Sequence, residues 1–416
     1  MNTSPLRSGV FRRLFLAQVL ALVGTGLTTV ALGLLAVDIA GSDAGAVLGT
    51  ALAIKMVAYV TIAPVVTALA AHLPRRLVLV SADIVRCSAV VALPFIQDAW
   101  QIYALVALMQ AAAAVFTPTF QAVIPAVLPD EATYTRALSL SRLAYDLESL
   151  LSPVAAGALL AFATFESLFV GTAIGFACSA LLVLTTRFPS SQGEDHVEGA
   201  VVRSVRDRVM VGMRRFGHVG ELRALLALNV VVACATSFVI VNTPVIVKEA
   251  FGRDNSQVAL ALAAYGAGSM LAALIVPRML DRIADRRVML LAAAIVPPVL
   301  AATWGALALL SDPLAWLAVL ALWFFAGVAT SMILTPTGRL LRRASTENDR
   351  PAVFAAQFSL SHLCFLVTYP VAGWVGSITS PAIAAACLAI IGGAAGLTAR
   401  AQWPNAPLQR PSIPHG

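Results

Sequence analysis

Long apolar stretches, separated by short segments with charged and turn-forming residues, run through almost the whole chain. An α-helix needs about 20 apolar residues to cross the hydrocarbon core of a bilayer. About twelve windows of that length fit between the breaks. The pattern therefore predicts twelve transmembrane helices, near residues 14–37, 45–71, 77–96, 101–124, 137–162, 167–186, 222–247, 257–280, 288–310, 314–336, 352–378 and 382–399.

Composition supports this all-α, multi-pass membrane fold. Of the 416 residues, 59% are hydrophobic and 12% are charged, whereas about a quarter of a water-soluble chain is charged. The mean hydropathy is +0.87. The five cysteines are scattered through predicted spans without paired spacing, which predicts small buried residues and neither a disulfide framework nor a metal box.

Most of the 28 basic residues fall in alternate loops on one side, beginning with Arg7, Arg12 and Arg13 before the first span. Basic loops stay in the cytoplasm, so we expect both termini there and the chain in a bacterial inner (cytoplasmic) membrane. The first apolar window is too long for a cleaved signal and predicts a retained span. The basic loops also explain the net charge of +7, without a nucleic-acid partner.

The chain divides into two similar parts. We expect a six-helix unit over 1–186, a polar linker over 187–221 with a short amphipathic helix near 200–216, a second six-helix unit over 222–400 and a tail over 401–416. Three motifs recur, at offsets of 220, 218 and 211: Ser139-Leu-Ser with Ser359-Leu-Ser, Thr117-Pro-Thr with Thr335-Pro-Thr, and Arg75-Arg76 with Arg286-Arg287. The two Thr-Pro-Thr motifs are expected to end the fourth and tenth spans. An even number of spans per unit predicts a parallel repeat about an axis along the membrane normal.

Charged residues inside the predicted spans are functional candidates, because placing them in lipid is costly. Arg142 and Asp146 are four residues apart on one helix face, and Asp83 and Arg86 are three apart. Side chains at these spacings can pair. We interpret both sets as structural ion pairs.

Glu148 lies near the middle of the fifth span, about 17 Å from its start, and faces away from Asp146. Lys55 and His362 lie at a similar depth. Glu148 and Lys55 would form a neutral gate, or Glu148 would carry protons with Lys55 as a fixed counter-ion. His362 would be a second proton carrier, a ligand for a soft cation, or a partner in a helix–helix hydrogen bond.

With its two six-helix units, the chain resembles the transporters of the major facilitator superfamily over nearly its whole length. The resemblance implies two bundles that rock about a cavity lined by the first, fourth, seventh and tenth helices. It also implies a charged loop between the second and third helices, where Ala71 stands in place of the usual Asp and Arg75 and Arg76 follow; Asp281 and Arg282 occupy the better second copy. The polar residues on cavity-lining helices are Gln110, Asn229, Thr236, Ser237, Asn242, Thr330 and Ser331.

The stretches 116–121 and 136–153 are similar to an exporter branch that includes nickel-resistance, enterobactin and macrolide efflux proteins. The nickel exporters imply a divalent metal as substrate, with Asp146, Glu148 and His362 as ligands. The tail of this chain differs from a histidine-rich, metal-collecting tail, because its only histidine is His415. Siderophore or macrolide-like drug efflux is the alternative.

Motifs for other classes are missing from the sequence. No phosphate-binding loop is present to power a pump, and no catalytic or cofactor motif indicates an enzyme. We therefore expect a monomeric secondary exporter without cofactors, whose partners are a small solute or metal ion, protons and lipid. A non-transporting membrane receptor or assembly partner is the alternative from another class.

Overall fold

The structure is a computed structural model that describes residues 5–58, 73–128, 162–186, 210–345 and 350–404, with separate residues between 130 and 160. Every regular element in this described part is a helix. It contains ten helical segments long and apolar enough to cross a membrane, one of which runs from Gly9 to Val57 through two helices in succession. The chain is therefore an all-helical, multi-pass membrane protein.

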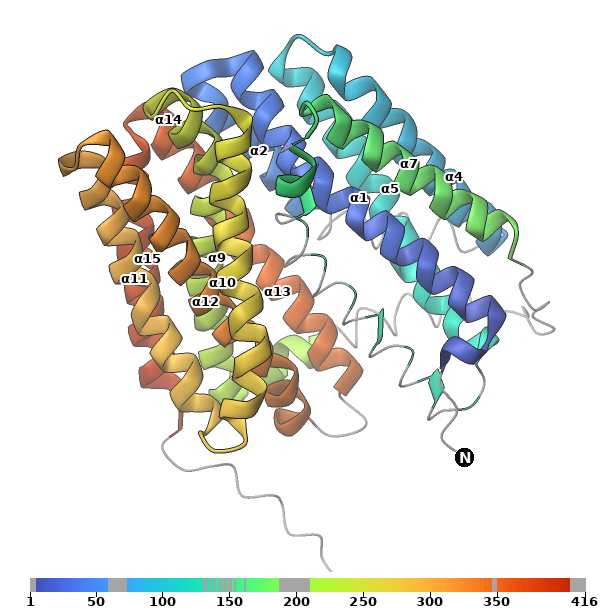
Figure 1. Cartoon of the computed structure of the whole chain (residues 1–416). Coiled ribbons are helices and arrows are strands. Elements are labelled where there is room, and N and C mark those ends of the chain that lie inside the picture. The colour runs from blue at the N-terminus through green and yellow to red at the C-terminus, as the bar shows by residue number, and fades with distance from the viewer. Residues whose placement is uncertain are drawn as a thin grey trace, which may run out of the picture.

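The helices form two groups along the chain, coloured blue to green and yellow-green to red in Figure 1. The first group contains α1 (Gly9–Ala40), α2 (Ala44–Val57), α4 (Arg75–Ala92), α5 (Ala99–Val127) and α7 (Glu166–Leu184). The second contains α9 (Gly220–Val245), α10 (Asn255–Leu280), α11 (Asp285–Leu309), α12 (Asp312–Ala344), α13 (Arg350–Pro370), α14 (Gly376–Ile378) and α15 (Pro381–Gln402). Short turns complete them: η1 (Pro5–Arg7), η2 (Gly41–Asp43), η4 (Leu93–Phe95), η5 (Ile246–Ala250) and η6 (Val371–Val375).

Helices pack in the same order in the two groups. In the first group α7 contacts α1 and α4, and α4 contacts α5. In the second group α15 contacts α9 and α11, and α11 contacts α12. Small residues allow the closest approach between α10 and α12, where a side chain at Gly268 or Gly327 would overlap the facing main chain.

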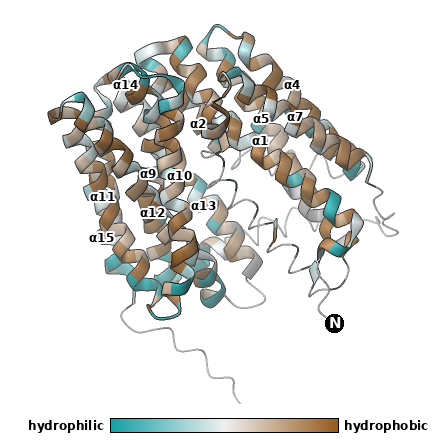
Figure 2. Cartoon of the chain, viewed as in Figure 1, coloured by the Kyte–Doolittle hydropathy of each residue, from teal (hydrophilic) through white to brown (hydrophobic). Residues whose placement is uncertain are grey.

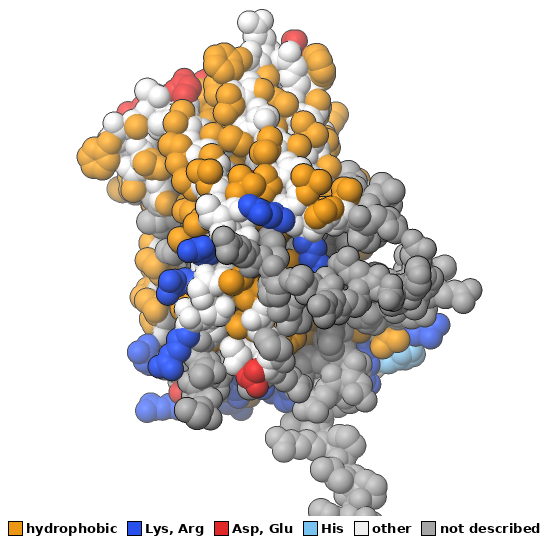
Figure 3. All heavy atoms as spheres, turned by 90° about the vertical axis from the view of Figure 1, so that its right-hand side faces the viewer, with side chains coloured by type: hydrophobic (Ala, Val, Ile, Leu, Met, Phe, Trp, Pro, Cys, Tyr) orange, Lys and Arg blue, Asp and Glu red, His pale blue; other side chains and the backbone are white. Residues whose placement is uncertain are grey.

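The surface has the character of a membrane-spanning protein. Large apolar side chains such as Phe95, Leu309 and Ile390 are more than 70% exposed, and hydrophobic residues cover the lengths of the helices in Figure 2. Figure 3 shows the same apolar band on the side of the first group, with basic side chains toward its lower part. Such an apolar band is suited to contact with lipid and not with water.

We name the two ends of the molecule by their residues. The arginine-rich end carries Arg13, Arg76, Arg286, Arg343 and Arg400; the opposite end carries Asp38, Asp98, Lys248, Asp254 and Asp312. The two helix groups approach each other at the opposite end and diverge toward the arginine-rich end (Figure 1).

Three polar contacts join the groups at the opposite end. Lys248 Nζ lies 2.8 Å from Asp38 Oδ1. The indole nitrogen of Trp374 donates to the Thr50 hydroxyl at 3.0 Å. The main-chain N–H of Ala46 donates to the Ser377 hydroxyl, also at 3.0 Å.

Glycine makes this junction tight. A side chain at Gly49 would come within 2.7 Å of the Tyr369 carbonyl oxygen, and one at Gly373 would overlap the main chain at Gly45. Close main-chain packing of this kind is typical of helix pairs in membranes. The opposite end is therefore closed between the two groups.

The structure corrects two expectations about helix ends. The Thr-Pro-Thr motifs do not end their helices: α5 continues past Pro118 to Val127, and α12 past Pro336 to Ala344. Proline is tolerated inside membrane helices where hydroxyl groups supply donors, and the Thr337 hydroxyl donates to the Ile333 carbonyl at 2.9 Å. The extra turns of α12 carry arginines, which a search for apolar windows cannot include.

Other boundaries differ slightly. The second group begins at Gly220, two residues before the predicted boundary, and α15 ends at Gln402. Of the expected linker helix near 200–216, residues 200–209 lie outside the described part, and residues 210–218 are helical.

Candidate transport site

Glu148 and Lys55 come from different helices of the first part of the chain and interact electrostatically. Lys55 lies near the end of α2, and Glu148 lies in the helical stretch that contains Ser152. Each side chain is partly buried. The carboxylate and the ammonium group are thus two partly buried, opposite charges within electrostatic range of each other.

Two small residues shape the environment of the Glu148 carboxyl group. The Ser152 hydroxyl donates a hydrogen bond to it. Gly26 of α1 lies opposite, where an added Cβ would overlap Ser152 and come within 2.9 Å of Glu148 Oε1. Only glycine at position 26 leaves the carboxyl group in this position. Sequence reasoning missed Gly26, because a lone glycine in an apolar helix carries no signal.

Two tyrosines from the second group complete the surroundings. Tyr369 of α13 lies within electrostatic range of both Glu148 and Tyr265 of α10. The Tyr265 hydroxyl is 3.0 Å from the Thr236 hydroxyl and 3.2 Å from that of Thr330. The candidate site therefore draws residues from both groups of helices: charges from the first, and hydroxyls and aromatic rings from the second.

The remaining predicted cavity residues of the second group are mostly engaged in bonds between helices. Asn229 and Gln357 exchange two amide hydrogen bonds, at 3.2 and 3.1 Å, between α9 and α13. The hydroxyls of Ser237 and Thr368 are 2.7 Å apart, and Asn242 Nδ2 donates to the Ala372 carbonyl at 3.1 Å. These bonds join α9 to the α13–η6 segment along much of its length.

Ser331 and Gln110 differ from that group. The Ser331 hydroxyl lies 3.5 Å from Thr335 in its own helix. Gln110 of α5 is 7% exposed, and its side-chain oxygen has no hydrogen-bond partner among the described residues. A buried amide oxygen without a partner is costly, so Gln110 has hydrogen-bonding capacity that a ligand could use.

His362 lies on α13, partly exposed, with its ring against Phe358. The ring centroids are 4.1 Å apart, and Nδ1 lies 2.6 Å from the Phe358 carbonyl oxygen. An imidazole nitrogen 2.6 Å from a carbonyl oxygen donates its hydrogen to that oxygen.

Asp83 and Arg86 form an ion pair within α4, as their spacing predicts. The Ser179 hydroxyl donates to Asp83 at 2.6 Å, and the Arg86 guanidinium lies between the rings of Phe116 and Phe176, 4.5 and 4.6 Å from their centroids. This pair is thus enclosed by α5 and α7. Arg142 and Asp146 lie outside the described residues.

The predicted loop residues play different parts. Arg76 donates to the Leu184 carbonyl at the end of α7, and Arg75 begins α4. Asp281 and Arg282 are exposed. The charge that holds helix ends together in the second group is instead Asp285, 2% exposed, which receives Arg343 Nη1 at 3.0 Å and Arg339 Nε at 3.5 Å. Arg343 also reaches Glu221 of α9 at 3.5 Å.

Metal-ligating residues do not gather in the part of the chain that the structure describes. It contains no group of three His, Cys, Asp or Glu side chains that could hold an ion. Of the three predicted ligands, Glu148 and His362 are described and Asp146 is not.

Comparisons with known proteins agree with this architecture. No curated protein matches the sequence. A variant of the nucleoside transporter NupG superimposes with a TM-score of 0.70 at 13% identity, covering 95% of this chain and 100% of that one. A bacterial homologue of the human lysosomal transporter Spinster, in an inward-facing and unoccupied conformation, gives 0.65 at 15% identity, covering 97% and 100%. A POT family transporter in complex with a thioalcohol-conjugated peptide gives 0.65 at 11% identity, covering 93% and 94%.

At these identities the superpositions establish the fold alone. The sequence itself matches the family described as transmembrane secretion effector over residues 1–337. That match spans the whole first group of helices, the linker and the second group as far as α12. The chain therefore belongs to the transmembrane secretion effector family of the major facilitator superfamily, and it is a membrane transporter.

Proposed function

We propose that the protein exports a small organic solute across the cytoplasmic membrane in exchange for protons, with Glu148 as the proton carrier. The observation that carries the proposal is the Glu148–Lys55 pair, partly buried and within electrostatic range of Tyr369 of the other helix group. Ionisable groups inside a membrane span are costly and are kept where they work.

The pair links protonation to conformation. With Glu148 ionised, its charge and that of Lys55 cancel, and little is gained by admitting water. Protonation of Glu148 leaves the ammonium group of Lys55 without its partner in a low-dielectric interior, which is costly. A conformation that hydrates the site relieves this cost, so proton binding shifts the balance between two states.

In the second state the opposite end, which is closed in this structure, would be open. We infer that the arginine-rich end is cytoplasmic, as the distribution of basic residues favours, and that both termini lie there. The closed junction at the opposite end then corresponds to an inward-facing transporter. Opening outward would break the Asp38–Lys248 pair and separate Gly49 from Tyr369.

A twelve-helix arrangement of two parallel repeats suits this motion. The 211-residue offset that relates Arg75 to Arg286 also relates Gly33 to Pro244. An added Cβ at Gly33 would lie 3.0 Å from Pro244 Cγ. Equivalent positions that touch each other lie close to the axis that relates the two units, which supports a repeat axis between α1 and α9.

The substrate that fits best is organic. The site offers aromatic rings at Tyr265 and Tyr369 and the hydroxyls of Tyr265, Thr236 and Thr330, a combination suited to a partly polar, partly apolar molecule. Divalent metal export fits less well, because the ammonium group of Lys55 would repel a cation held by Glu148. Siderophore or macrolide-like efflux remains within the organic class.

Transport in inside-out vesicles tests the proposal. Glu148→Gln should abolish efflux driven by a pH gradient, because the carboxamide of glutamine does not take up a proton near neutral pH. Glu166→Gln, at an exposed carboxylate at the start of α7, is the matched control and should transport normally. A growth panel with nickel, cobalt, siderophores and macrolides supplies the substrate for the assay.

Three results would contradict the proposal. Equal gradient-driven efflux by wild type and Glu148→Gln would exclude Glu148 as the carrier. Protection of cells against nickel or cobalt alone would restore the metal hypothesis. No transport of any panel compound by folded wild-type protein would favour the receptor or assembly partner.

A further inference from the structure

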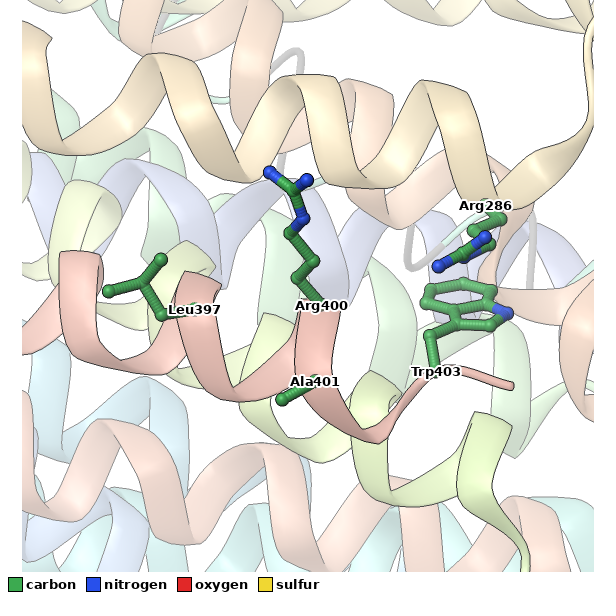
Figure 4. Close-up of a pocket in the computed structure, with 5 residues that line it drawn as sticks. All are labelled: Arg286, Leu397, Arg400, Ala401 and Trp403. Atoms are coloured by element: carbon green, nitrogen blue, oxygen red, sulfur yellow. The ribbon is translucent and has the colours of Figure 1, made fainter. Parts of the chain in front are cut away.

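A hollow of about 480 Å³ lies between α11 and α15 at the arginine-rich end, outside the candidate transport site. Its walls are Arg286, Leu397, Arg400, Ala401 and Trp403. Figure 4 shows Leu397, Arg400 and Trp403 rising from α15 and the segment after it toward α11, where Arg286 lies over the indole ring. Two guanidinium groups thus border one hollow, with an aromatic wall.

The described residues that line this hollow include two arginines. None of these five described residues is acidic. Asp285, the neighbour of Arg286, is buried and bound by Arg339 and Arg343. Arg400 is exposed and forms no hydrogen bond or ion pair with the described residues. An anion with several acceptor oxygens matches two guanidinium groups.

The wall is rigid and amphipathic. Trp403 is only 4% exposed, so its ring is fixed by packing and is not a mobile surface side chain. Tryptophan and arginine at the end of a membrane helix are typical of the boundary between headgroups and hydrocarbon. These residue types at the end of α15 favour a position for the hollow at the depth of the lipid phosphates.

An apolar track leads into it. Ile383, Ile390 and Leu397 follow one another at intervals of seven residues, which places them on one face of α15. They are 45%, 73% and 71% exposed. Leu397, the last of them, is itself part of the hollow. A phosphate at the arginines would continue into an acyl chain along this face.

We propose that this hollow binds an anionic phospholipid, its phosphate between Arg286 and Arg400 and an acyl chain along Ile383, Ile390 and Leu397. A soluble phosphate would use the arginines but would leave the track unexplained. Basic pockets between membrane helices on the cytoplasmic side are suited to anionic headgroups. The site is independent of the transport proposal, because it shares no residue with the surroundings of Glu148.

Native mass spectrometry of the full chain in detergent, titrated with phosphatidylglycerol, tests the site. Wild-type protein should retain phosphatidylglycerol over phosphatidylcholine, and glycerol phosphate at equal concentration should not displace it. Arg286→Gln with Arg400→Gln should weaken phosphatidylglycerol retention by about tenfold or more, since each basic residue near the surface contributes. Leu397→Gln should weaken it by a smaller factor through the acyl chain alone.

The matched control is Arg278→Gln with Arg287→Gln, which removes the same charge from exposed arginines near the same end that do not line the hollow. It should retain the lipid as wild type does. Equal loss in both double variants would mean that the basic rim acts as a whole, and would overturn the site. Displacement by glycerol phosphate would identify a phosphate site without a lipid. If the pocket variant failed to fold, Arg286→Lys with Arg400→Lys, which keeps the charge but loses the planar guanidinium groups, should still prefer phosphatidylglycerol with reduced retention; unchanged or absent preference would refute the proposal.

Discussion

The two groups of helices place their charges differently. Among the described residues, the first group carries charges inside its spans: Lys55 with Glu148, and Asp83 with Arg86 in α4. The charged network of the second group lies at the arginine-rich end, where Asp285 holds Arg339 and Arg343. The described spans of the second group are instead joined at depth by uncharged pairs such as Asn229 with Gln357.

The polar residues of the two groups are therefore suited to different roles. Charges at depth are expensive and respond to protons, so in the proposed cycle the first group would couple an ion gradient to movement. Uncharged hydrogen bonds keep their strength over a wide pH range, so in that proposal the second group would remain one body while the first changes state. The carboxylate network then holds the helix ends of the second group, whereas Arg13 and Arg76 of the first donate to main-chain carbonyls at the end of α7.

The largest expected effect comes from separating the buried charges of the first group. Lys55→Met should lower the free energy of unfolding by about 3 kcal/mol, because it leaves the Glu148 carboxylate without its cation. Lys55→Met with Glu148→Gln should recover most of this loss, which thermal unfolding in detergent would measure. If the double variant is less stable than the single one, the two residues are not coupled and the contrast between the groups fails.

A smaller effect is expected at the network of the second group. Asp285→Asn should cost about 2 kcal/mol, because Asp285 is buried but both of its arginine partners are about half exposed. Arg76→Gln, the comparison in the first group, removes an exposed hydrogen bond to a carbonyl and should cost about 1 kcal/mol or less. Thermal unfolding of both variants shows whether contacts at the arginine-rich end contribute more to stability in the second group than in the first.

The smallest expected effect concerns the residue that precedes the second helix of each group. Asp43 and Asp254 are equivalent at an offset of 211, and each precedes its helix, α2 or α10. The Asp254 carboxylate accepts from the Gln257 N–H at 3.1 Å, whereas Asp43 makes no such bond. Asp254→Ala should therefore cost about 1 kcal/mol, and Asp43→Ala close to none.

The helix cap also has a pH dependence. Hydrogen bonds from the Ser256 hydroxyl and the Gln257 N–H hold the pKa of Asp254 below its ordinary value. A lowered carboxyl pKa contributes stability that is complete above the pKa of the unfolded chain, about 4, and that disappears as pH falls through the lower pKa of the folded state. The difference between wild type and Asp254→Ala should thus be constant near neutral pH and shrink only in acid. A difference that grew in acid would exclude the cap.

Local features of the fold could be predicted from the sequence. Helical spacing alone pairs Asp83 with Arg86, because both residues lie on one turn of one helix. Hydropathy identifies the membrane class for the same reason: it sums over neighbours in the chain. Helix ends were less predictable, since α12 continues through Pro336 and its arginines beyond the apolar window.

Contacts between helices could not be predicted in the same way. Asp285 stands next to Asp281 and Arg282 in a motif, yet it is the buried one because the ends of α11 and α12 meet there. Gly26 carries no pattern at all, and its role depends on Ser152 and Glu148 packing against α1. Hydropathy gives each helix its depth but says little about its rotation about its own axis.

The sequence by itself determined that this chain crosses a membrane many times and that its basic residues gather in alternate loops. These are properties of order along the chain, set by the cost of placing polar groups in lipid. Only the tertiary structure decided that Glu148 and Lys55 interact and that Gly26 lies against Glu148. It also decided that Asp285 holds the arginines and that α11 and α15 border a basic hollow. Those arrangements depend on how helices distant in sequence pack, and packing is decided by side-chain shape across an interface.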